Sequence, residues 1–356
     1  MQAQANHNLV EVPEIKAPFL VEDGPYAEEA QRRHMQWADR HDVFCSSEER
    51  RRFEAMDMGA LADLLYPEAS SPENLQLVAD WCAWLLLRDD RWDSTEATGE
   101  WERLARRDRA YLRLMRHRAQ RGVGLSRDED DGCNSLYGAL ADLCQRLRTH
   151  ARQKSQPEPV DRRLVAVMKG FFFASIRETA YQHRGTCPTL SEYVGMRSVT
   201  GGLDILTFVL GALDGVRLSK RLLDDPAVRR LTTASHNVCC WHNDLVSLNK
   251  ELVSGEVHNL VLVLQQDPEG GRFTLPEAVD AAERMICEEL ETFVDLKQGV
   301  GGREGPHARA AAWYAYMLRN RVGGVISWQE SCAARYKEAF ATSTSGRAKA
   351  KPDSGR

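Results

Sequence analysis

The helical pattern that runs through almost the whole chain is the feature that most limits its fold. From Tyr26 to about Phe340, leucine, alanine, arginine and glutamate dominate, and the alternation of β-branched residues that marks strands is hard to find. Short polar breaks such as Ser70-Ser71-Pro72 and Asp224-Asp225-Pro226 separate the segments, and none of them is long enough to be a linker between domains. The sequence therefore predicts an all-α fold, a single domain of roughly ten or more helices.

The two ends of the chain differ from this helical body. Residues 1–25 carry three prolines between short apolar patches, and we predict that they form an extended N-terminal arm. Residues 341–356 are mostly serine, lysine, alanine and glycine without apolar periodicity, and we predict a disordered tail there. The helical domain is therefore expected to span residues 26–340.

The composition narrows the class of protein. Apolar residues make up 43% of the 356 residues and charged residues 28%, which is typical of a globular protein with a full core. The net charge of −5 comes from interspersed charges of both signs, so no basic face argues for nucleic acid. The longest apolar run, Trp81 to Leu87, is too short for a membrane span, and the polar N-terminus is unlike a secretory signal.

The nine cysteines bear on the compartment. They are an odd number at irregular spacing, without a C-x-x-C pair, so neither a zinc ribbon nor a disulfide framework is indicated. Reduced thiols in a cytoplasmic protein are the expectation. The sequence leaves open whether the protein forms a homodimer.

Two carboxylates share one face at the end of an apolar helix. Trp81–Asp93 is predicted to be one helix, in which Asp89 and Asp93 lie four residues apart while Asp90 is turned away by about 100°. Such carboxylates repel each other unless a cation lies between them, and magnesium is usually held by one or two carboxylates together with phosphate oxygens. A solvated acidic helix end would have the same pattern.

A second row of oxygen donors lies far downstream. Asn243, Ser247 and Glu251 follow one another at i, i+4 and i+8 on a helix that Asp225-Pro226 is predicted to begin. Amide, hydroxyl and carboxylate oxygens are hard ligands that can hold a further divalent ion, with Lys250 close by for phosphate charge. The polar face of a surface helix is the alternative interpretation.

Two further elements carry donors for phosphate. A capping box, Thr189-Leu190-Ser191-Glu192, opens a helix that carries Arg197, and Gly201-Gly202 breaks that helix in the middle of apolar sequence. Near the end of the chain, the adjacent Arg335 and Tyr336 can both donate to phosphate oxygens. Any one of these arginines alone would more often be a surface ion-pair partner.

Together these elements resemble those of bacterial class I terpene synthases. The resemblance covers about residues 10–340 and rests on LVADWCAWLLLRDDRWD (77–93), TLSEYVGMRSVTGG (189–202), NDLVSLNKELVSGEVHNLV (243–261) and ARY (334–336). In that family a diphosphate-sensing arginine precedes the asparagine at the spacing that separates Arg197 from Asn243. The resemblance implies the class I terpenoid synthase fold, a single helical domain around a central active-site cavity.

The resemblance also implies a role for each matching residue. The ligands of three magnesium ions would be Asp89 and Asp93 for two ions and Asn243, Ser247 and Glu251 for the third. The diphosphate would be held by four donors: Arg197, Lys250, Arg335 and Tyr336. Thr200 would stand at the linker position, and Gly201 at the effector position, whose carbonyl points at the bond that breaks.

The activity implied is magnesium-dependent ionisation and cyclisation of a linear isoprenyl diphosphate to a cyclic terpene, with release of diphosphate. Farnesyl diphosphate is the commonest substrate of relatives of this size, and geranylgeranyl diphosphate stays open because pocket depth depends on packing. A chain-elongating prenyltransferase would instead need a second Asp-rich cluster where this chain has Asn243, Ser247 and Glu251. A helical binding protein without turnover is the alternative from another class.

The sequence also contains candidate residues for the wall of the cavity. Trp84 and the run Phe171-Phe172-Phe173 are candidates, although a core role fits each of them equally well. Relatives often have aromatic residues directly before the Asp-rich motif, whereas this chain has Leu85-Leu86-Leu87. The wall there is therefore expected to offer less cation–π stabilisation.

Overall fold

All regular secondary structure in the described part of the chain is α-helical, as predicted. The computed structural model describes residues 10–96, 101–116, 134–154, 160–266 and 273–347, and it describes their side chains except at 92–96, 101, 103–104, 134, 160–161, 254 and 333–347. The helices are α1 (Ala27–Arg40), α2 (Ser47–Met56), α3 (Met58–Leu65), α4 (Pro72–Glu96), α5 (Trp101–Arg116), α6 (Asn134–Gln153), α7 (Val160–Arg184), α8 (Leu190–Thr200), α9 (Leu203–Asp214), α10 (Lys220–Leu223), α11 (Pro226–Ser254), α12 (Leu260–Gln266), α13 (Leu275–Gly301) and α14 (Ala308–Arg347).

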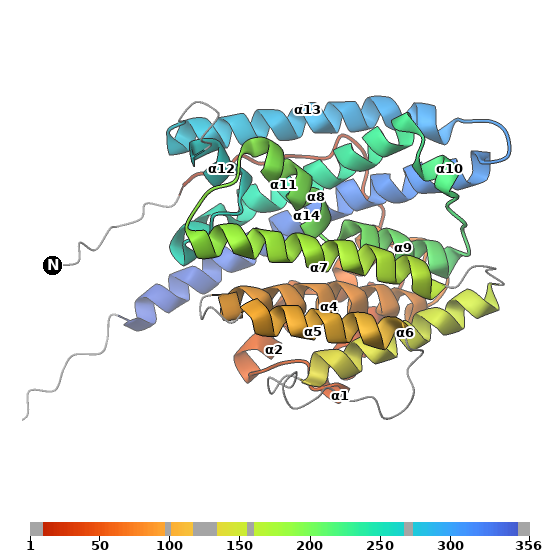
Figure 1. The fold of residues 1–356 in the computed structure, drawn as a ribbon, viewed down its shortest axis with the longest axis horizontal. Coiled ribbons are helices and arrows are strands. Elements are labelled where there is room, and N and C mark those ends of the chain that lie inside the picture. Colours follow the sequence, from red (N-terminus) through yellow and green to blue (C-terminus); the bar gives the residue numbers. More distant parts are fainter. Residues whose placement is uncertain (1–9, 97–100, 117–133, 155–159, 267–272, 348–356) are drawn as a thin grey trace, which may run out of the picture.

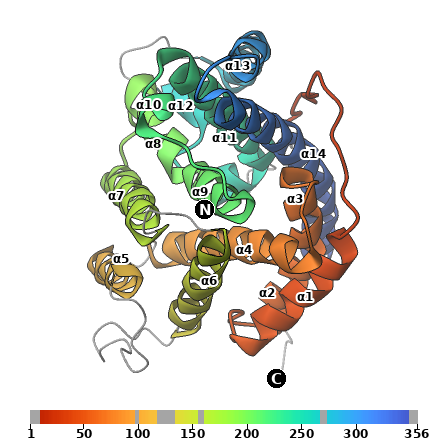
Figure 2. The same ribbon diagram turned by 90° about the vertical axis from the view of Figure 1, so that its right-hand side faces the viewer.

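The long helices lie side by side, and several of them end at the same end of the molecule. The C-terminal ends of α4, α7, α11 and α14 all lie on the left in Figure 1. Seen from the end, α8 and α9 lie between the group α4–α7 and the group α11–α14 (Figure 2). Because both predicted metal-binding segments are near the C-terminal ends of α4 and α11, this arrangement brings them to one end of the bundle.

The ends of α11 follow its capping residues. Asp225 Oδ1 accepts hydrogen bonds from the backbone N–H groups of Ala227, at 2.9 Å, and Val228, at 3.2 Å, and Pro226 occupies the first turn. At the other end Gly255 takes a left-handed conformation, with φ 78°. The predicted start of this helix is confirmed, and the helix ends at Ser254, directly before this glycine.

The break between α8 and α9 is also where the sequence placed it. Thr189 and Glu192 form the predicted capping box at the start of α8. Gly202 has φ 68°, a conformation that favours glycine, and α9 starts at the next residue. Apolar residues then cover nearly the whole circumference of α9, which makes it a central, buried helix.

The C-terminal helix continues beyond the boundary that we predicted at residue 340. It runs to Arg347, so the first part of the predicted tail is helical, and residues 348–356 lie outside the described range. Adding residues to an existing helix costs little compared with starting one, so a segment without apolar periodicity can still extend it.

The N-terminal arm lies across α11, α13 and α14 without regular secondary structure from residue 10 to residue 26. The backbone N–H of Val10 donates to Oδ1 of Asn249 at 2.9 Å, and Nδ2 of Asn249 donates to the Val10 carbonyl at 3.0 Å. Farther along, the Phe19 ring lies 5.4 Å from Nζ of Lys297 and 5.3 Å from the guanidinium carbon of Arg319. The arm is therefore attached to the rest of the domain at both positions.

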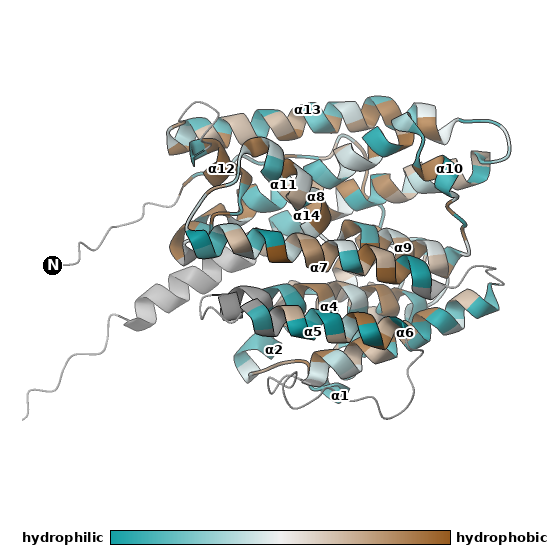
Figure 3. Cartoon of the chain, in the orientation of Figure 1, coloured by the Kyte–Doolittle hydropathy of each residue, from teal (hydrophilic) through white to brown (hydrophobic). Residues whose placement is uncertain are grey.

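One continuous hydrophobic core connects these helices. The outer helices α5, α7 and α13 carry hydrophilic and hydrophobic residues side by side, as amphipathic helices do (Figure 3). One stretch, Leu190–Asp214, is long and apolar enough to cross a membrane, with a mean hydropathy of 1.3 in its most apolar 18-residue window, but 67% of that window is buried in the protein. Since the Gly201-Gly202 break also divides it, this stretch is the core segment α8–α9.

Candidate active site

The predicted metal-binding segments come together at one end of the bundle. The carboxyl group of Glu178 on α7 is influenced by the charges of both Asp89 on α4 and Arg197 on α8. The carboxyl group of Asp90 is likewise influenced by Lys250 on α11. Such charge effects act over short distances, so α4, α7, α8 and α11 face one another here.

The row on α11 is already connected by hydrogen bonds. Ser247 Oγ donates to the Asn243 carbonyl at 2.7 Å, and Asn259 Nδ2 donates to Glu251 Oε2 at 2.8 Å. Asn243 Oδ1 in turn accepts from Arg197 Nη2 at 2.9 Å. The predicted row is therefore held in place by its own helix, by α8 and by the start of α12.

The carboxyl group of Glu251 has a raised pKa, and a bound cation would stabilise its ionised form. Burial and, to a smaller extent, the nearby charge of Asp244 raise the pKa of Glu251 to about 7, against the opposing effect of hydrogen bonds from Ser247 and Asn259. A divalent ion would favour the ionised form. Amide, hydroxyl and carboxylate oxygens form a hard donor set, which fits magnesium.

Asp244, which was not among the predicted site residues, connects the parts of this region. It is fully buried, and its Oδ1 accepts from Arg197 Nη2 at 2.8 Å and Nε at 3.1 Å. Its Oδ2 accepts from the Leu260 backbone N–H at 3.0 Å and from the Tyr193 hydroxyl. The only feature of the sequence that could have identified Asp244 is its position directly after Asn243, which turns its side chain around the axis of α11 toward α8.

Arg197 points at α11, with 16% of its side chain exposed. Burial disfavours its charged form, but several neighbouring acidic groups, of which Asp244 has the largest effect, together outweigh this and keep the pKa of Arg197 well above its usual value. The guanidinium is therefore a permanent positive charge at the edge of the site. The predicted diphosphate donor and the first ligand of the α11 row, Asn243, are in direct contact.

The Asp-rich end of α4 is more open. The side chain of Asp89 is 53% exposed, and its Oδ1 lies 4.0 Å from Nη1 of Arg88. Asp90 is turned away from Asp89, as the helical spacing predicts, and accepts from Arg52 Nη2 at 2.5 Å. The side chain of Asp93, the other predicted ligand, lies outside the described part of the structure.

A buried ion pair supports α4 directly below Asp89. Arg88 is fully buried and donates to Asp108 Oδ2 on α5 at 2.8 Å and to Ser175 Oγ on α7 at 3.0 Å. Its guanidinium carbon also lies 4.9 Å from the centre of the Phe171 ring and 5.2 Å from that of Phe172. Arg88 thus joins three helices, and neither its pairing with Asp108 nor its contact with Ser175 was predicted from the sequence.

The remaining diphosphate donors are described only in part. Lys250 is exposed on α11, beside Glu251. Arg335 and Tyr336 lie on α14, whose C-terminal part reaches the same end of the bundle (Figure 1), but their side chains lie outside the described part of the structure. The structure thus brings Asp89, Arg197, Lys250 and the α11 row to one region and leaves the contacts of the other three predicted residues as predictions.

A further carboxyl group faces this region from α7. Thr200 Oγ1, at the predicted linker position, donates to Glu178 Oε1 at 2.6 Å. Burial raises the pKa of Glu178 to about 8, against the opposing charge of Arg197. His258 Nε2 lies 2.7 Å from the Glu178 carbonyl, which fixes the backbone of α7 at this point. Glu178 was not among the predicted site residues.

The four proposed wall residues have different positions. A Cβ atom on the buried Gly202 would lie 3.6 Å from Leu85 and 3.8 Å from Phe171, so these two side chains border the α8–α9 break. Phe172 is also buried, and Trp84 donates to the Leu136 carbonyl at 2.9 Å. Phe173 is 65% exposed and is wrong as a wall residue, because each helix position turns the side chain by about 100°.

Within the described residues, no group of three or more histidine, cysteine, aspartate or glutamate side chains is placed to hold a metal ion. The α11 row does not contradict this, because two of its three predicted ligands are Asn243 and Ser247. The eight cysteines with described positions are free thiols. A structural zinc or disulfide centre is therefore not found in the described part of the chain.

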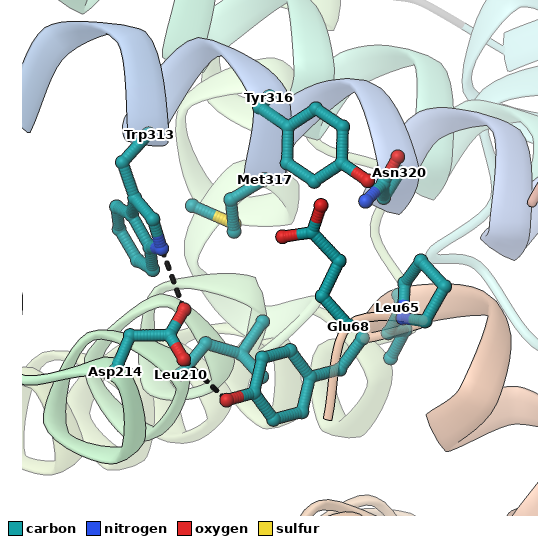
Figure 4. A pocket seen from close by; sticks show the side chains of 10 residues that line it. Leu65, Glu68, Leu210, Asp214, Trp313, Tyr316, Met317 and Asn320 are labelled. Carbon is teal, nitrogen blue, oxygen red and sulfur yellow. Dashed lines mark hydrogen bonds between the residues drawn. The ribbon is translucent and has the colours of Figure 1, made fainter. Parts of the chain in front are cut away.

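A hollow at the other end of α9 is distant from these motifs. Leu210 and Asp214 of α9, Trp313 and Tyr316 of α14 and Glu68 border it (Figure 4). Asp214 accepts hydrogen bonds from Trp313 Nε1, at 2.6 Å, and from the Tyr66 hydroxyl. Its carboxylate is satisfied by the protein itself, so this hollow is structural.

The helical architecture and the composition of the site define a class of protein. Solved structures with the same overall fold include linalool/nerolidol synthase from Streptomyces clavuligerus, with a TM-score of 0.72 at 20% identity over 89% of this chain and 100% of that chain. The α-eudesmol synthase structure gives a TM-score of 0.71 at 20% identity, over 89% and 98% of the two chains. The fold is therefore the class I terpenoid synthase fold, as predicted.

The family follows from the sequence comparison. Residues 80–292, which include both metal-binding segments, match the model described as terpene synthase family 2, C-terminal metal binding. The (+)-T-muurolol synthase of Roseiflexus castenholzii, named as cyclising (2E,6E)-farnesyl diphosphate, is 30% identical over 87% of this chain and 87% of its own length. This chain belongs to the terpene synthase family, and the match to a metal-binding domain implies a divalent metal.

Proposed function

We propose that this protein is a magnesium-dependent sesquiterpene synthase that ionises and cyclises farnesyl diphosphate and releases diphosphate. The observation that carries the proposal is the contact between Arg197 and the Asn243–Glu251 row, with Asp89 facing the same region. The similarity to the Roseiflexus castenholzii enzyme, whose name specifies farnesyl diphosphate, favours this substrate.

Five residues would hold three magnesium ions: Asp89, Asp93, Asn243, Ser247 and Glu251. When bound, these ions would neutralise the negative charge that develops on the departing diphosphate. The buried carboxyl group of Glu251 fits this role because a divalent ion would replace the proton that burial favours.

Arg197, Lys250, Arg335 and Tyr336 would bind the diphosphate from the protein side. Each donates a hydrogen bond, and the three basic groups add positive charge, so all four stabilise the leaving group more strongly as its charge grows. Arg197 would exchange its contact with Asn243 for phosphate oxygens while Asp244 keeps its guanidinium oriented. Gly201, next to the helix break, would present its carbonyl to the allylic carbon.

The apolar residues beside the break would shape and dry the cavity. Leu85 and Phe171 border the break and offer no nucleophile to the allylic cation. A cavity of this kind excludes water until the ring has closed.

We place the enzyme in the cytoplasm, as a protein without a nucleic-acid partner, and a homodimer is compatible with this function.

The test is incubation of the purified protein with magnesium and, separately, the C10, C15 and C20 diphosphates, followed by gas chromatography with mass detection. We expect cyclic C15 products from farnesyl diphosphate. Cyclic C20 products alone would identify a diterpene synthase instead. Longer linear products, formed only when an allylic diphosphate and isopentenyl diphosphate are supplied together, would identify a prenyltransferase, and binding without turnover would identify a silent binding protein.

A further inference from the structure

Gly201 and Gly202 occupy the same break for different reasons. Gly202 has a positive φ of 68°, so its backbone conformation itself favours glycine. Gly201 has φ −62° and ψ −10°, a right-handed conformation open to any residue. A Cβ atom on Gly201, however, would lie 2.4 Å from Sγ of Cys240, far closer than atoms can approach. Space, and not backbone conformation, therefore restricts position 201.

The residue that fills this space is on the metal-binding helix. Cys240 is buried on α11, one turn before Asn243. Its Sγ donates to the Arg197 carbonyl at 3.5 Å, and the same carbonyl accepts the Gly201 backbone N–H at 3.0 Å. Cys240 thus contacts both residues of the last turn of α8 that the proposed function uses.

The thiol is suited to a structural contact and not to chemistry. Burial raises the pKa of Cys240 to about 11, and the Arg197 charge opposes this only in part. The group is therefore a neutral S–H donor at physiological pH. Since Arg197 is held through its guanidinium by Asn243 and Asp244 and through its carbonyl by Cys240, residues 240–244 of α11 fix it at both ends.

We propose that Cys240 is a positioning residue of the active site, which sets the separation between the α8–α9 break and the metal-binding helix and so places the Gly201 carbonyl. This inference rests on the proposed function, in which that carbonyl faces the bond that breaks. The side chain acts in two ways: its volume keeps Gly201 at a fixed distance from α11, and its S–H group ties the Arg197 carbonyl to the same helix.

The geometry supplies a compensating pair of substitutions. Beyond Sγ of Cys240, the nearest atoms to a Cβ at position 201 are the Arg197 carbonyl oxygen at 3.5 Å and a Leu203 carbon at 3.9 Å. The Cβ atom of Cys240 is therefore no closer than 3.9 Å. In the double variant Gly201→Ala/Cys240→Ala, the new methyl group would occupy the space of the lost thiol without a clash, which conserves volume.

The experiment compares wild type, Gly201→Ala, Cys240→Ala, the double variant and Cys240→Ser in steady-state kinetics with farnesyl diphosphate and magnesium. We expect Gly201→Ala to lower kcat about tenfold or more with little change in KM, because a displacement of this size misplaces the reacting groups. Cys240→Ala should lower kcat by about threefold, while Cys240→Ser, which keeps a donor of similar size, should stay within about twofold of wild type. The double variant should regain at least about threefold over Gly201→Ala.

A double variant no more active than Gly201→Ala, or a Cys240→Ala variant with wild-type kcat and product distribution, would overturn the inference. Urea unfolding of the same set separates this failure from a failure of the proposed function, since it needs no substrate. The double variant should then unfold at a higher urea concentration than Gly201→Ala. If wild type turns over none of the diphosphates but this recovery is seen, the packing inference holds and the proposed function fails.

Discussion

The two predicted metal-binding segments are built in opposite ways. On α11, Asn243 and Glu251 are partly buried and already hydrogen-bonded to Arg197 and Asn259. On α4, the side chain of Asp89 is 53% exposed, and its closest described ion-pair partner, Arg88, lies as far as 4.0 Å away. The α11 segment therefore holds its donor atoms in place before any ligand binds, whereas the carboxylate of α4 depends on a cation for its position.

The residues that hold the two segments in place differ in the same way: those of α11 lie in the site itself, and those of α4 lie outside it. Asp244 contacts Arg197, Tyr193 and the start of α12 within the site itself. The buried Arg88–Asp108 pair lies below the Asp-rich motif and holds the helix rather than the carboxylate. Pre-organised donors lose less conformational entropy when they bind an ion. We therefore expect the donors on α11 to determine the affinity for the first ion, and the carboxylate on α4 to take up its position once that ion is bound.

The largest effect is expected for Asp244→Ala, because it leaves the mostly buried guanidinium of Arg197 without its carboxylate. Breaking such a pair costs about 3–5 kcal/mol of the free energy of unfolding. Asp89→Ala, at an exposed position, should change it by less than about 0.5 kcal/mol. Urea denaturation measures both, and equal losses for the two variants would show that the contrast between the segments does not exist.

The next largest effect concerns catalysis. Glu251→Gln keeps an acceptor for Asn259 but removes the charge, and we expect kcat/KM to fall on the order of 10³-fold. Asp89→Asn should lower kcat/KM on the order of 10²-fold, since Asp93 is predicted to share its ions. Rates measured over a range of magnesium concentrations test this. A greater loss for Asp89→Asn would reverse the proposed ranking.

A smaller effect is expected from pH. Burial raises the pKa of Glu178 to about 8 and that of Glu251 to about 7, both from 4.5, so the folded protein keeps protons that the unfolded chain releases. The contribution of these groups to stability is thus present at low pH and lost as pH rises toward 8. Below 6.5 the histidines oppose this, because burial lowers the pKa of His236 and His258 to about 4.

We therefore expect the free energy of unfolding to fall on the order of 1 kcal/mol between pH 6.5 and 8 in the absence of magnesium. Glu178→Gln should reduce this dependence and raise stability at pH 8. Urea midpoints at three pH values in this window measure both. A wild-type stability that rises from pH 6.5 to 8 would contradict the raised pKa values.

The smallest effect is expected at the N-terminal arm. Asn249→Ala removes both hydrogen bonds to Val10, on a helix face turned away from Glu251, and should cost about 1 kcal/mol of the free energy of unfolding. Activity at saturating substrate should change by less than about threefold. A loss of activity comparable to that of Glu251→Gln would mean that the arm acts on the α11 row directly.

Features set by neighbouring residues could be predicted from the sequence. Asp225-Pro226 and Gly255 bound α11, the Thr189 capping box starts α8, and the glycine pair ends it, because each depends on a few consecutive residues. The spacing of Asn243, Ser247 and Glu251 likewise predicted that the three residues share one helix face, because that spacing depends only on residues within one helix.

Features that join distant segments could not be predicted. Asp244 and Arg197 are 47 positions apart, and nothing in the local pattern identifies Asp244 as the partner. Phe173 continues an aromatic run with Phe171 and Phe172, yet it faces solvent because the orientation of α7 in the bundle decides which side is buried. The pairing of Arg88 with Asp108 and the contact of Cys240 with Gly201 depend likewise on tertiary packing.

The pairing of Val10 with Asn249 has a consequence for the order in which the protein is assembled. The two residues are 239 positions apart, so Val10 cannot make these hydrogen bonds until the ribosome has added the residues of α11. Its docking also requires α11 to have formed, and a contact of such long range closes late in folding. The arm therefore docks only on a chain in which α11 has already been translated and folded.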